Sequence, residues 1–495
     1  MNVTTRSPQF AVTFITEHRG TFTVTDTHDS LLSIDVQRQL GHACGAFQLT
    51  MAPRPIEGSP SGAWWDILSP QDFCEIRIWV PPAKAFQPVM RGFIDTVSLH
   101  ANYGARGQRV VSIAGRDYGK LFLNTRLYYP TEEVQQAALF QRWQHAYKDL
   151  FGDLHGAPPE RPSMSPNQTD DGPNFSPSDL HRAIFEGFYQ PMEEEFLATF
   201  EGAVRPPAMA LALRVGSDPW EAHLRAFSPT FFQKSMAPWT ELHVLMYAYQ
   251  HRPWRELFIV EDIDSPTLVY RPSPWLTKEG EWVQGAPGGT LHTWDIADEQ
   301  IVSLTLSRSD AQALNYFLTY PELYGALAQM AKATGDLEGV FEGPLRKNPY
   351  LSGFADAGVT LPSGGDTFAS RYQRFGFRIA EFSTPYLSMN RGLKREAVQR
   401  KIADLTEQGV EGTRRLYQAF DHNHLLQDGT IVLRGDDRIQ IGDYLRLTDR
   451  GNARYYVESV RQDFRVGTQT GDGHFLTHCT VSRGRGHLVD HYGLP

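Results

Sequence analysis

Residues 89–122 read VMRGFIDTVSLHANYGARGQRVVSIAGRDYGKLF, and this stretch decides the fold of the N-terminal part of the chain. Two runs rich in Val, Ile, Phe and Thr flank a polar turn, a pattern that predicts a β-hairpin. Gly104 or Gly107 can supply the positive φ that such a turn demands. The hairpin ends in the segment Gly115-Arg116-Asp117-Tyr118, which we interpret as an architectural corner and not as an active site.

Short strand candidates recur around this hairpin, from residue 10 to residue 115, at intervals of about 10–15 residues, a spacing typical of an all-β barrel or sandwich. In residues 73–80 the side chains of Glu75, Arg77 and Trp79 alternate with apolar ones. This alternation predicts one buried face and one polar face. At the corner, Arg116 and Asp117 are predicted to form an ion pair that is either a directional, buried bidentate pair or a turn pair of little energetic value.

The period of the apolar residues changes after residue 119. Leu139, Trp143 and Leu150 recur at helical spacing, which predicts an amphipathic helix that begins near Thr131. Six prolines between residues 153 and 179 indicate an exposed loop, and a second helix is expected from 179 to 190, where Pro191 breaks or restarts it.

A second β-rich region opens near residue 254 with ELFIVED and TLVYRPSPW. Residues 309–333 and 390–420 are expected to be mostly helical, and strands return in the segments TIVLRG, RIQIGDYLRL, ARYYVESVRQDF and HFLTHCTVSR.

Composition narrows the class of protein. The chain has 495 residues, of which 41% are hydrophobic and 21% charged, as expected of an ordinary globular protein with several domains. Its formal net charge of −10 argues against a surface that wraps DNA. Three widely separated cysteines indicate reduced thiols in a protein made in a cytoplasm, and neither a signal peptide nor a membrane anchor is expected.

Several residue groups that resemble catalytic or metal sites favour a structural interpretation. Adjacent carboxylates at 170–171 and 193–195 are most simply solvated, and no nucleophile elbow or nucleotide-binding loop is present in the sequence. His422 and His424 would point the same way in an extended segment, yet a metal site needs further ligands. His474 and His478 lie in a predicted strand, about 13 Å apart, which is too far for one ion. We therefore expect no enzyme activity, no catalytic residue, no cofactor and no metal.

Three separated parts of the chain carry a resemblance to a known family. The order RGFIDTV, polar turn, VSIAGRDYGKL resembles the first tube-forming domain of the baseplate hub proteins of contractile phage tails. The phrase WRELFIVED…PTLVYRPSPW resembles the opening of that family's second tube-like domain, and IGDYLRL…YYVESV…FLTHCTVSRG resembles its closing strands. The signature residues that we carry over are Gly115, Arg116, Asp117, Tyr118 and Arg271.

The resemblance implies an α+β fold with two tail-tube-like antiparallel β-barrel domains and helical insertions. The first tube-like domain is expected at 1–125 and a helical domain at 126–250 with its Pro-rich loop at 153–179. The second tube-like domain is discontinuous, 251–310 plus 425–486, around a helical insertion at 311–424, and 487–495 form a tail.

The resemblance also implies a function. The chain would be the structural hub of a contractile-tail baseplate, a homotrimeric ring that connects the tail tube to the central spike and leaves a channel for DNA. Its partners would be the central spike protein, the tail tube or tube-initiator protein, the C-terminus of the tape-measure protein and the baseplate wedge proteins, with transient contact to passing DNA. Its location would be the tail baseplate of a virion.

Two alternatives belong to other functional classes. A hub-borne cell-wall hydrolase would use Glu194 or Glu195 as catalytic carboxylates. A carbohydrate-binding tail adhesin would use exposed Trp and Tyr side chains. Activity on peptidoglycan and glycan binding by the isolated monomer distinguish these two possibilities from a ring-forming structural protein.

Overall fold

The structure is a computed structural model, and it describes residues 9–17, 19–25, 30–52, 64–79, 86–101, 109–128, 138–151, 174–200, 209–216, 226–227, 239–242, 253–285, 291–314, 316–321, 374–376, 378–384, 411–420, 422–466 and 473–485. Several sequence predictions fall outside these residues. They are the hairpin turn with Gly104 and Gly107, the helix start at Thr131, the Pro-rich loop up to residue 173, the carboxylates at 170–171, most of 311–424 and the tail.

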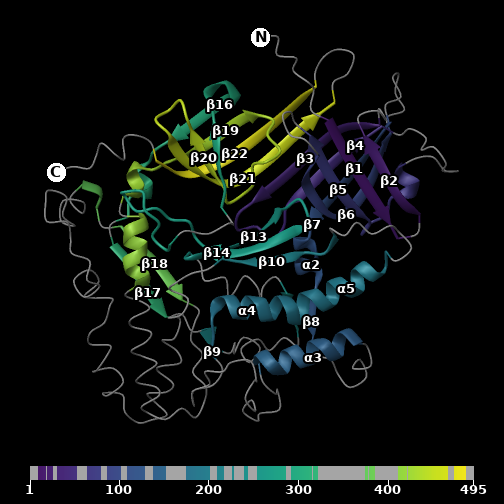
Figure 1. Ribbon diagram of the computed structural model, residues 1–495, viewed down its shortest axis with the longest axis horizontal. Coiled ribbons are helices and arrows are strands. Elements are labelled where there is room, and N and C mark those ends of the chain that lie inside the picture. The colour runs from purple at the N-terminus through teal and green to yellow at the C-terminus, as the bar shows by residue number, and fades with distance from the viewer. Residues whose placement is uncertain are drawn as a thin grey trace.

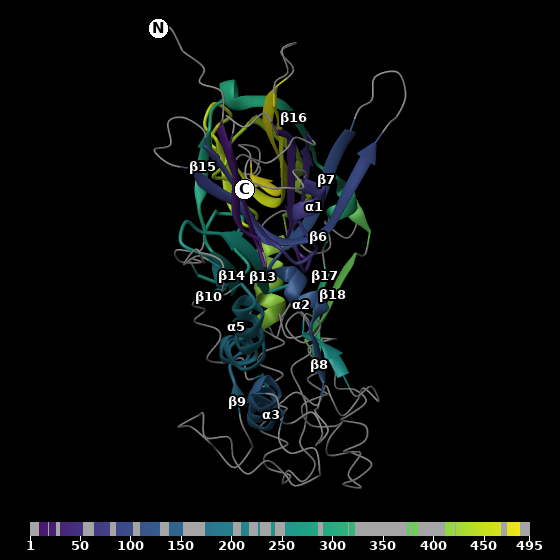
Figure 2. The ribbon, with the colours of Figure 1, turned by 90° about the vertical axis from the view of Figure 1, so that its right-hand side faces the viewer.

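One 13-stranded sheet dominates the described part of the chain. Its main path runs β16-β19-β22-β21-β3-β4-β7-β6-β5-β1-β2, and β20 joins β15 to β21 beside this path. Neighbouring strands are antiparallel except for the pair β15–β20. The sheet is strongly curled, as the view along its edge in Figure 2 shows.

The N-terminal strands of this sheet, which we call the first β region, coincide with the predicted ones. They are β1 (Gln9–Thr16), β2 (Gly20–Thr25), β3 (Leu31–Gln39), β4 (Ala46–Met51), β5 (Phe73–Trp79), β6 (Gln87–Ala101) and β7 (Arg109–Asp117). The quoted stretch is thus the hairpin β6–β7, paired from Gly92↔Asp117 to Ala101↔Arg109. A one-turn helix α1 (Trp64–Ile67) precedes β5. The prediction of Glu75 on a polar face is wrong, because its side chain is buried.

The C-terminal strands form the second β region. They are β15 (Thr293–Ile296), β16 (Ile301–Ser307), β19 (Gln427–Arg434), β20 (Tyr444–Leu447), β21 (Ala453–Arg465) and β22 (His474–Arg485). The strand β21 pairs with β3 from Ser459↔Gln39 to Arg465↔Ser33, so both regions lie side by side in one sheet (Figure 1). Two separate barrels were predicted. One shared sheet is found because pairing β3 with β21 satisfies two strand edges that would otherwise stay open.

A small mixed sheet lies beneath the large one. It contains β10 (Ala212–Val215), β14 (Pro266–Pro272) and β13 (Arg255–Glu261), with β10 parallel and β13 antiparallel to β14. Every residue of β14 is buried. The strands of 255–272 pair with each other and with β10, and not with the closing strands. Phe258 and Val269 nevertheless pack in the apolar cluster of the second β region.

Helices cover the far side of the small sheet (Figure 1). They are α2 (Gly119–Asn124), α3 (Ala138–Phe151), α4 (Pro177–Ile184), a π-helical segment (Phe185–Tyr189) and α5 (Gln190–Ala198). The sequence predicted that the apolar side of α3 is buried, and this is confirmed at Trp143. Its side chain lies in the apolar cluster that these helices share with β13 and β14. Pro191 does not break the helix. It lies in the first turn of α5, where the backbone nitrogen need not donate a hydrogen bond within the helix.

The predicted helical segment 309–333 is wrong where the structure describes it. Asp310–Gln312 form one 3₁₀ turn, and Tyr316–Pro321 form strand β17, parallel to β18 (Ile379–Thr384). The sequence YFLTYP is rich in aromatic and β-branched residues, which favour strands. Residues 411–420 are helical, as predicted. Short two-residue and three-residue strands β8 (Arg126–Tyr128), β9 (Asn174–Phe175), β11 (Ala226–Phe227) and β12 (Trp239–Glu241) complete the described elements.

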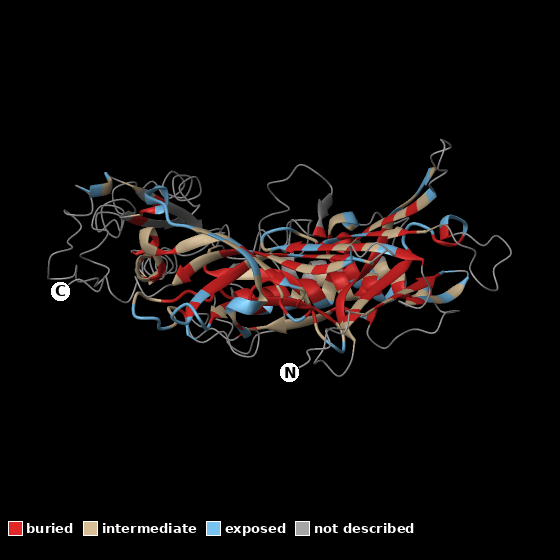
Figure 3. Ribbon diagram, turned by 90° about the horizontal axis from the view of Figure 1, so that it is seen from above, coloured by how far each residue is buried: buried red, intermediate tan, exposed pale blue. Residues whose placement is uncertain are grey.

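Buried residues are concentrated in the strands at the centre of the molecule (Figure 3). One apolar cluster fills the first β region, another joins the second β region to β13 and β14, and a third lies between the small sheet and the helices. Among the described residues, no helix is long and apolar enough to cross a membrane.

Candidate functional site

Five buried charged residues meet where the two β regions contact the small sheet. We call them the junction cluster, and its members are Arg38 on β3, Glu75 on β5, Arg91 on β6, Asp117 at the end of β7 and Glu261 at the end of β13. Each is at most 7% exposed. Charges at this depth are stable only when they are paired and hydrogen-bonded.

Arg91 is the centre of this cluster. Its Nε donates to Glu75 Oε1 at 2.8 Å, and its Nη1 lies 3.3 Å from Glu261 Oε2. The same guanidinium donates to the carbonyl oxygens of Asp262 and Ile263, each at 2.9 Å, in the turn between β13 and β14. All three guanidinium nitrogens therefore have partners, and one side chain holds the tip of the small sheet against β5 and β6.

Arg38 links the cluster to the corner at the end of β7. Its Nη2 donates to Glu261 Oε1 at 2.6 Å and its Nη1 to the carbonyl oxygen of Val89 at 2.8 Å. Asp117 lies 3.6 Å from Arg38 Nε, and its two oxygens accept the backbone amides of Gly45 and Gly119 at 2.8 and 2.9 Å. Asp117 thus closes the turn that leads from β7 into α2.

The second β region reaches the junction cluster through Gln440. Its side-chain oxygen accepts the Glu261 amide at 2.8 Å, and its side-chain nitrogen donates to the Glu261 carbonyl at 2.5 Å. Burial raises the pKa of Glu261 and of Asp117, and the neighbouring Arg38 opposes this shift at both carboxyls. The cluster therefore joins the first β region, the second β region and the small sheet through charge and hydrogen bonds, and each of its five residues is buried.

The signature residues of the corner take separate roles. A Cβ on Gly115 would lie 2.3 Å from the ring of Phe47 and 2.5 Å from the Phe93 carbonyl oxygen, so the close approach of strands here requires glycine. Tyr118 is fully buried, and its hydroxyl donates to the carbonyl oxygen of Met209. The corner is thereby tied to the chain that follows the helices.

The predicted ion pair between Arg116 and Asp117 is wrong. Successive side chains of a strand point to opposite faces, so these two neighbours cannot meet. Arg116 instead makes a bidentate pair with Asp95, at 2.6 and 2.9 Å, and Lys120 Nζ lies 3.0 Å from the same carboxylate. We call Asp95, Arg116 and Lys120 the corner cluster. Burial raises the pKa of Asp95, but hydrogen bonds from Arg116 and Lys120 outweigh it, so the pKa is lowered.

Arg271 on β14 forms a second buried anchor. Its Nη2 donates to the Gly442 carbonyl at 2.6 Å and lies 3.3 Å from Glu256 Oε2, while the Tyr456 hydroxyl donates to that carboxylate at 2.6 Å. The guanidinium also lies over the ring of Phe258, 4.9 Å from its centroid. Arg271 therefore ties the small sheet to β21 of the second β region.

The carboxylates proposed for a hydrolase do not form an open pair. Glu193 is buried, and its Oε1 accepts the Tyr189 hydroxyl at 3.0 Å and the Leu211 amide at 2.9 Å. Burial raises the pKa of Glu193 to about 7. Glu194 lies on the surface in an ion pair with Arg142 at 2.8 Å, and Glu195 is exposed. These neighbours on one helix face different surroundings, and no cleft between them is among the cavities described below.

The histidine pairs also differ from metal sites. Asn423–Leu425 form a 3₁₀ turn and not an extended segment, so His422 and His424 project in different directions. His474 and His478 lie in β22, as predicted, and His474 contacts Asp463 at 3.4 Å. Within the described ranges, no group of three or more His, Cys, Asp or Glu side chains is arranged to hold a metal ion.

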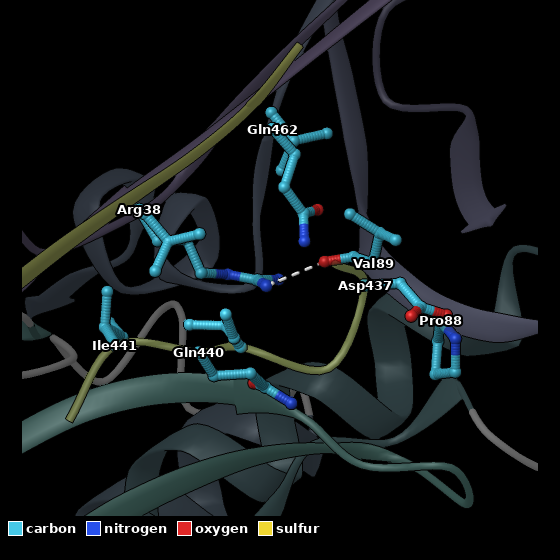
Figure 4. Close-up of a pocket in the computed structure, with 10 residues that line it drawn as sticks. Arg38, Pro88, Val89, Asp437, Gln440, Ile441 and Gln462 are labelled. Carbon is cyan, nitrogen blue, oxygen red and sulfur yellow. Dashed lines mark hydrogen bonds between the residues drawn. The ribbon is translucent and has the colours of Figure 1, made fainter. Parts of the chain in front are cut away.

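Two cavities in the described part of the chain are small. One of about 20 Å³ lies beside the junction cluster, between β3, β6, β21 and the segment 437–441 (Figure 4). Another of about 10 Å³ lies between Trp275, Phe420 and Tyr444. Neither has the several hundred Å³ that a small-molecule site usually offers.

Within the described strands, the main path of the large sheet ends at β2 and at β16, each paired on one side only, and its side branch ends at β15, which carries the charged Asp295. β2 and β16 end the path of described strands, and Figure 1 shows them at its two sides. Their sequences, GTFTVT and IVSLTLS, contain no charged residue and no proline. Val302 on β16 is 54% exposed. Edges of natural sheets are usually protected by charges, prolines or bulges, and the one register shift in β16 is confined to its first residues.

Sequence reasoning missed most of the junction cluster. Glu75 and Arg91 stand among apolar residues in β5 and β6, and that was the available signal. Arg38 lies in a strand with several other polar residues, and Glu261 is the last residue of β13, so neither stands out in the sequence. A charge inside an apolar run indicates either a solvent-facing position or a buried pair, and only the fold shows which. The partners Arg91 and Glu261 lie 170 positions apart in the sequence.

Comparison with known proteins gives similarity in solved structures alone. No protein-family model matches the sequence, and no curated protein matches it. The chain is similar to the tail protein from Neisseria meningitidis MC58 (TM-score 0.41, 11% identity, 96% of each chain). It is also similar to the 43 kDa tail protein of prophage MuSo2 from Shewanella oneidensis (TM-score 0.43, 10% identity, 96% of this chain and 98% of that chain). A further similar structure is the half-lidded Francisella PdpA-VgrG complex (TM-score 0.41, 8% identity, 97% of this chain and 58% of that chain).

Proposed function

We propose that this chain is the structural hub of a contractile-tail baseplate, and that three copies close a ring between the tail tube and the central spike. The observation that carries the proposal is the pair of unprotected edges, β2 and β16, at opposite ends of one curled sheet. A contact between two different edges of identical chains is head-to-tail, and it generates a ring when the rotation closes.

The construction of the sheet supports the same proposal. In this proposal each β region is one tube-like unit of the family that the sequence resembles, and the pairing of β21 with β3 joins the two units within one chain. Pairing β16 of one copy with β2 of the next would repeat that join between chains. Three chains would then offer six tube-like units to a six-fold tube, through obligate interfaces of more than about 2,000 Å².

We propose a mechanical role and not a catalytic one. Glu194, the carboxylate of the hydrolase alternative, forms an exposed ion pair with Arg142. The adhesin alternative has an exposed Trp65 but no groove of a sugar's size among the described cavities. The proposed partners are the central spike, the tube or its initiator, the C-terminus of the tape-measure protein and the wedge proteins. The net charge of −10 suits a lumen through which DNA passes without binding.

The mass of the native protein tests this proposal. We expect three protomer masses for the wild-type chain in analytical ultracentrifugation at micromolar concentration. Val302→Lys places a charge on the open edge of β16, and we expect it to give a monomer with unchanged circular dichroism.

A matched control separates the edge from surface charge in general. Thr430 is exposed on β19, which has partners on both sides, so Thr430→Lys should leave the trimer intact. A monomeric wild-type protein, alone and with a spike present, contradicts the hub. A trimer that survives Val302→Lys shows that β16 is not the interface.

A further inference from the structure

The two β regions repeat the same strand order. The first one pairs its strands in the order β3-β4-β7-β6-β5-β1, and the second one in the order β16-β19-β22-β21-β20-β15. Strands at the same place in the two series also follow each other in the same order along the chain. Only the pair β15–β20 differs in direction from its counterpart, because it is parallel. β3 therefore corresponds to β16, and β6 corresponds to β21.

The repeat extends to single residues, because register shifts fall at the same places in both regions. The shift between β3 and β4 leaves Leu32 bulged, and the shift between β16 and β19 leaves Val302 bulged. Both bulged residues are exposed, at 37% and 54%. The β6–β7 hairpin has a shift at Asp95, and the β21–β22 hairpin has one at Glu458. These bulges show which residues of the two regions correspond.

The bulge at Glu458 divides the long strand β21 between two neighbours. Before it, β21 pairs with β20, and after it Ser459–Arg465 pairs with β3 of the first region. The bulge at Asp95 divides β6 in the same way. Before it, β6 pairs with β5, but after it no described strand pairs with Thr96–Ala101 on the side away from β7. We call Thr96–Ala101 the β6 arm.

The β6 arm lacks the usual protection of a strand edge. Its sequence, TVSLHA, contains no Asp, Glu, Lys, Arg or Pro. Leu99 is apolar and yet 44% exposed. Figure 2 shows the β6–β7 hairpin extending past the rest of the sheet. An uncharged edge of this kind can accept a further strand.

We infer that the β6 arm of one copy pairs with β16 of the next copy, antiparallel, as β21 pairs with β3 within one chain. The part of β21 that corresponds to the β6 arm meets β3, and the counterpart of β3 is β16. β3 already has β4 and β21 as neighbours, whereas β16 pairs with β19 alone among the described strands. The inference rests on the proposed ring, and it gives β16 the β6 arm as its neighbour in place of β2.

The correspondence also gives the register of this contact. Within the chain, Gln462 lies opposite Val36. Counted from the bulges, the same contact between two copies places Leu99 opposite Leu306. Leu306 already packs against the apolar cluster of the second β region. Pairing therefore covers the exposed Leu99 with an apolar neighbour.

Disulfide formation between copies tests this contact. The next pair in the same register is His100 with Thr305, both exposed, so one variant carries His100→Cys and Thr305→Cys. A second variant carries Leu99→Cys and Leu306→Cys, because adjacent pairs of an antiparallel ladder alternate between a wide and a close separation. We expect oxidation of at least one of them to give covalent dimers and trimers on a denaturing gel, which a reductant removes.

A matched control separates the β6 arm from β2. Thr23→Cys with Thr305→Cys keeps the thiol on β16 and moves the other one to an exposed position of β2, and we expect no cross-link. Thr305→Cys alone controls for links to the native cysteines. A cross-link in the β2 variant, or none in either arm variant of a protein that sediments as a trimer, overturns the arm contact but not the ring. A monomeric wild-type chain contradicts the ring itself and this contact with it.

Discussion

The junction cluster and the corner cluster lie next to each other at the end of the β6–β7 hairpin, yet they use charge differently. In the junction cluster, Arg91 is 1% exposed at its side chain and Glu261 is fully buried. In the corner cluster, the Arg116 and Asp95 side chains are 31% and 26% exposed. Buried pairs fix one arrangement because breaking them leaves a charge without water, whereas exposed pairs are replaced by solvent at little cost.

The largest expected effect is the loss of Arg91. Arg91→Met removes the guanidinium from both Glu75 and Glu261, which remain buried, and we expect the free energy of unfolding to fall by about 3–5 kcal/mol. Urea unfolding at a fixed protomer concentration measures it. The control is Arg461→Met, which breaks the exposed pair with Asp35 and should cost less than about 1 kcal/mol. Similar losses in both variants would remove the distinction between buried and exposed ion pairs.

Glu193 extends the comparison to a buried carboxylate whose partners are a hydroxyl and an amide. Because its folded pKa is about 7 against 4.5 in the unfolded chain, the unfolded state ionises first as the pH rises. Stability should therefore fall between about pH 4.5 and pH 7, by up to about 3 kcal/mol. Glu193→Gln keeps the acceptor oxygen, and we expect it to abolish this fall and to be more stable than wild type at about pH 8.

The control for this pH dependence lies on the same helix. Glu194→Gln changes an exposed carboxylate whose side chain is 63% accessible, so the stability profile against pH should stay that of the wild type. Urea unfolding across this pH range measures all three proteins. A wild-type profile that is flat through this window would show that Glu193 is ionised without penalty.

A substitution of Asp117 tests the hydrogen bonds of the junction cluster while its central residue, Arg91, is left in place. Asp117→Asn keeps the shape but offers one oxygen to the two amides of Gly45 and Gly119, so one buried donor loses its acceptor. We expect a loss of about 1–3 kcal/mol in thermal or urea unfolding. Asp298→Asn, at an exposed pair with Arg450, should stay below about 1 kcal/mol. A smaller loss at Asp117 than at Asp298 would contradict its role as the closure of the corner.

The smallest effect is expected in the corner cluster. Arg116→Lys exchanges a bidentate contact with Asp95 for a single one at a position open to water, and the cost should be below about 1 kcal/mol. The trimer, measured by ultracentrifugation, should be unchanged. A loss of assembly in this variant would assign this half-buried corner to the subunit interface.

Local patterns were enough to find the strands. Alternation and β-branched content located the strands of the first β region and most of those in the second, because each strand's pattern is contained within it. Residues 316–321 were misassigned for a related reason, since a short aromatic run within a helical surround is ambiguous without its partner β18. The sequence also predicted Gly115 as a residue of the corner. It did not show why glycine is needed there, which is the close approach of Phe47 and Phe93.

The sequence by itself determined the β-rich character of this protein, the hairpin of residues 89–122 and the residues of its charged corner, because these depend on near neighbours in the chain. Only the tertiary structure decided that β3 and β21 merge the two β regions into one sheet and that Arg116 turns away from Asp117. It also decided that Arg91 meets Glu261 across 170 positions. Such pairings depend on which distant groups must be removed from water together, and no local pattern records that.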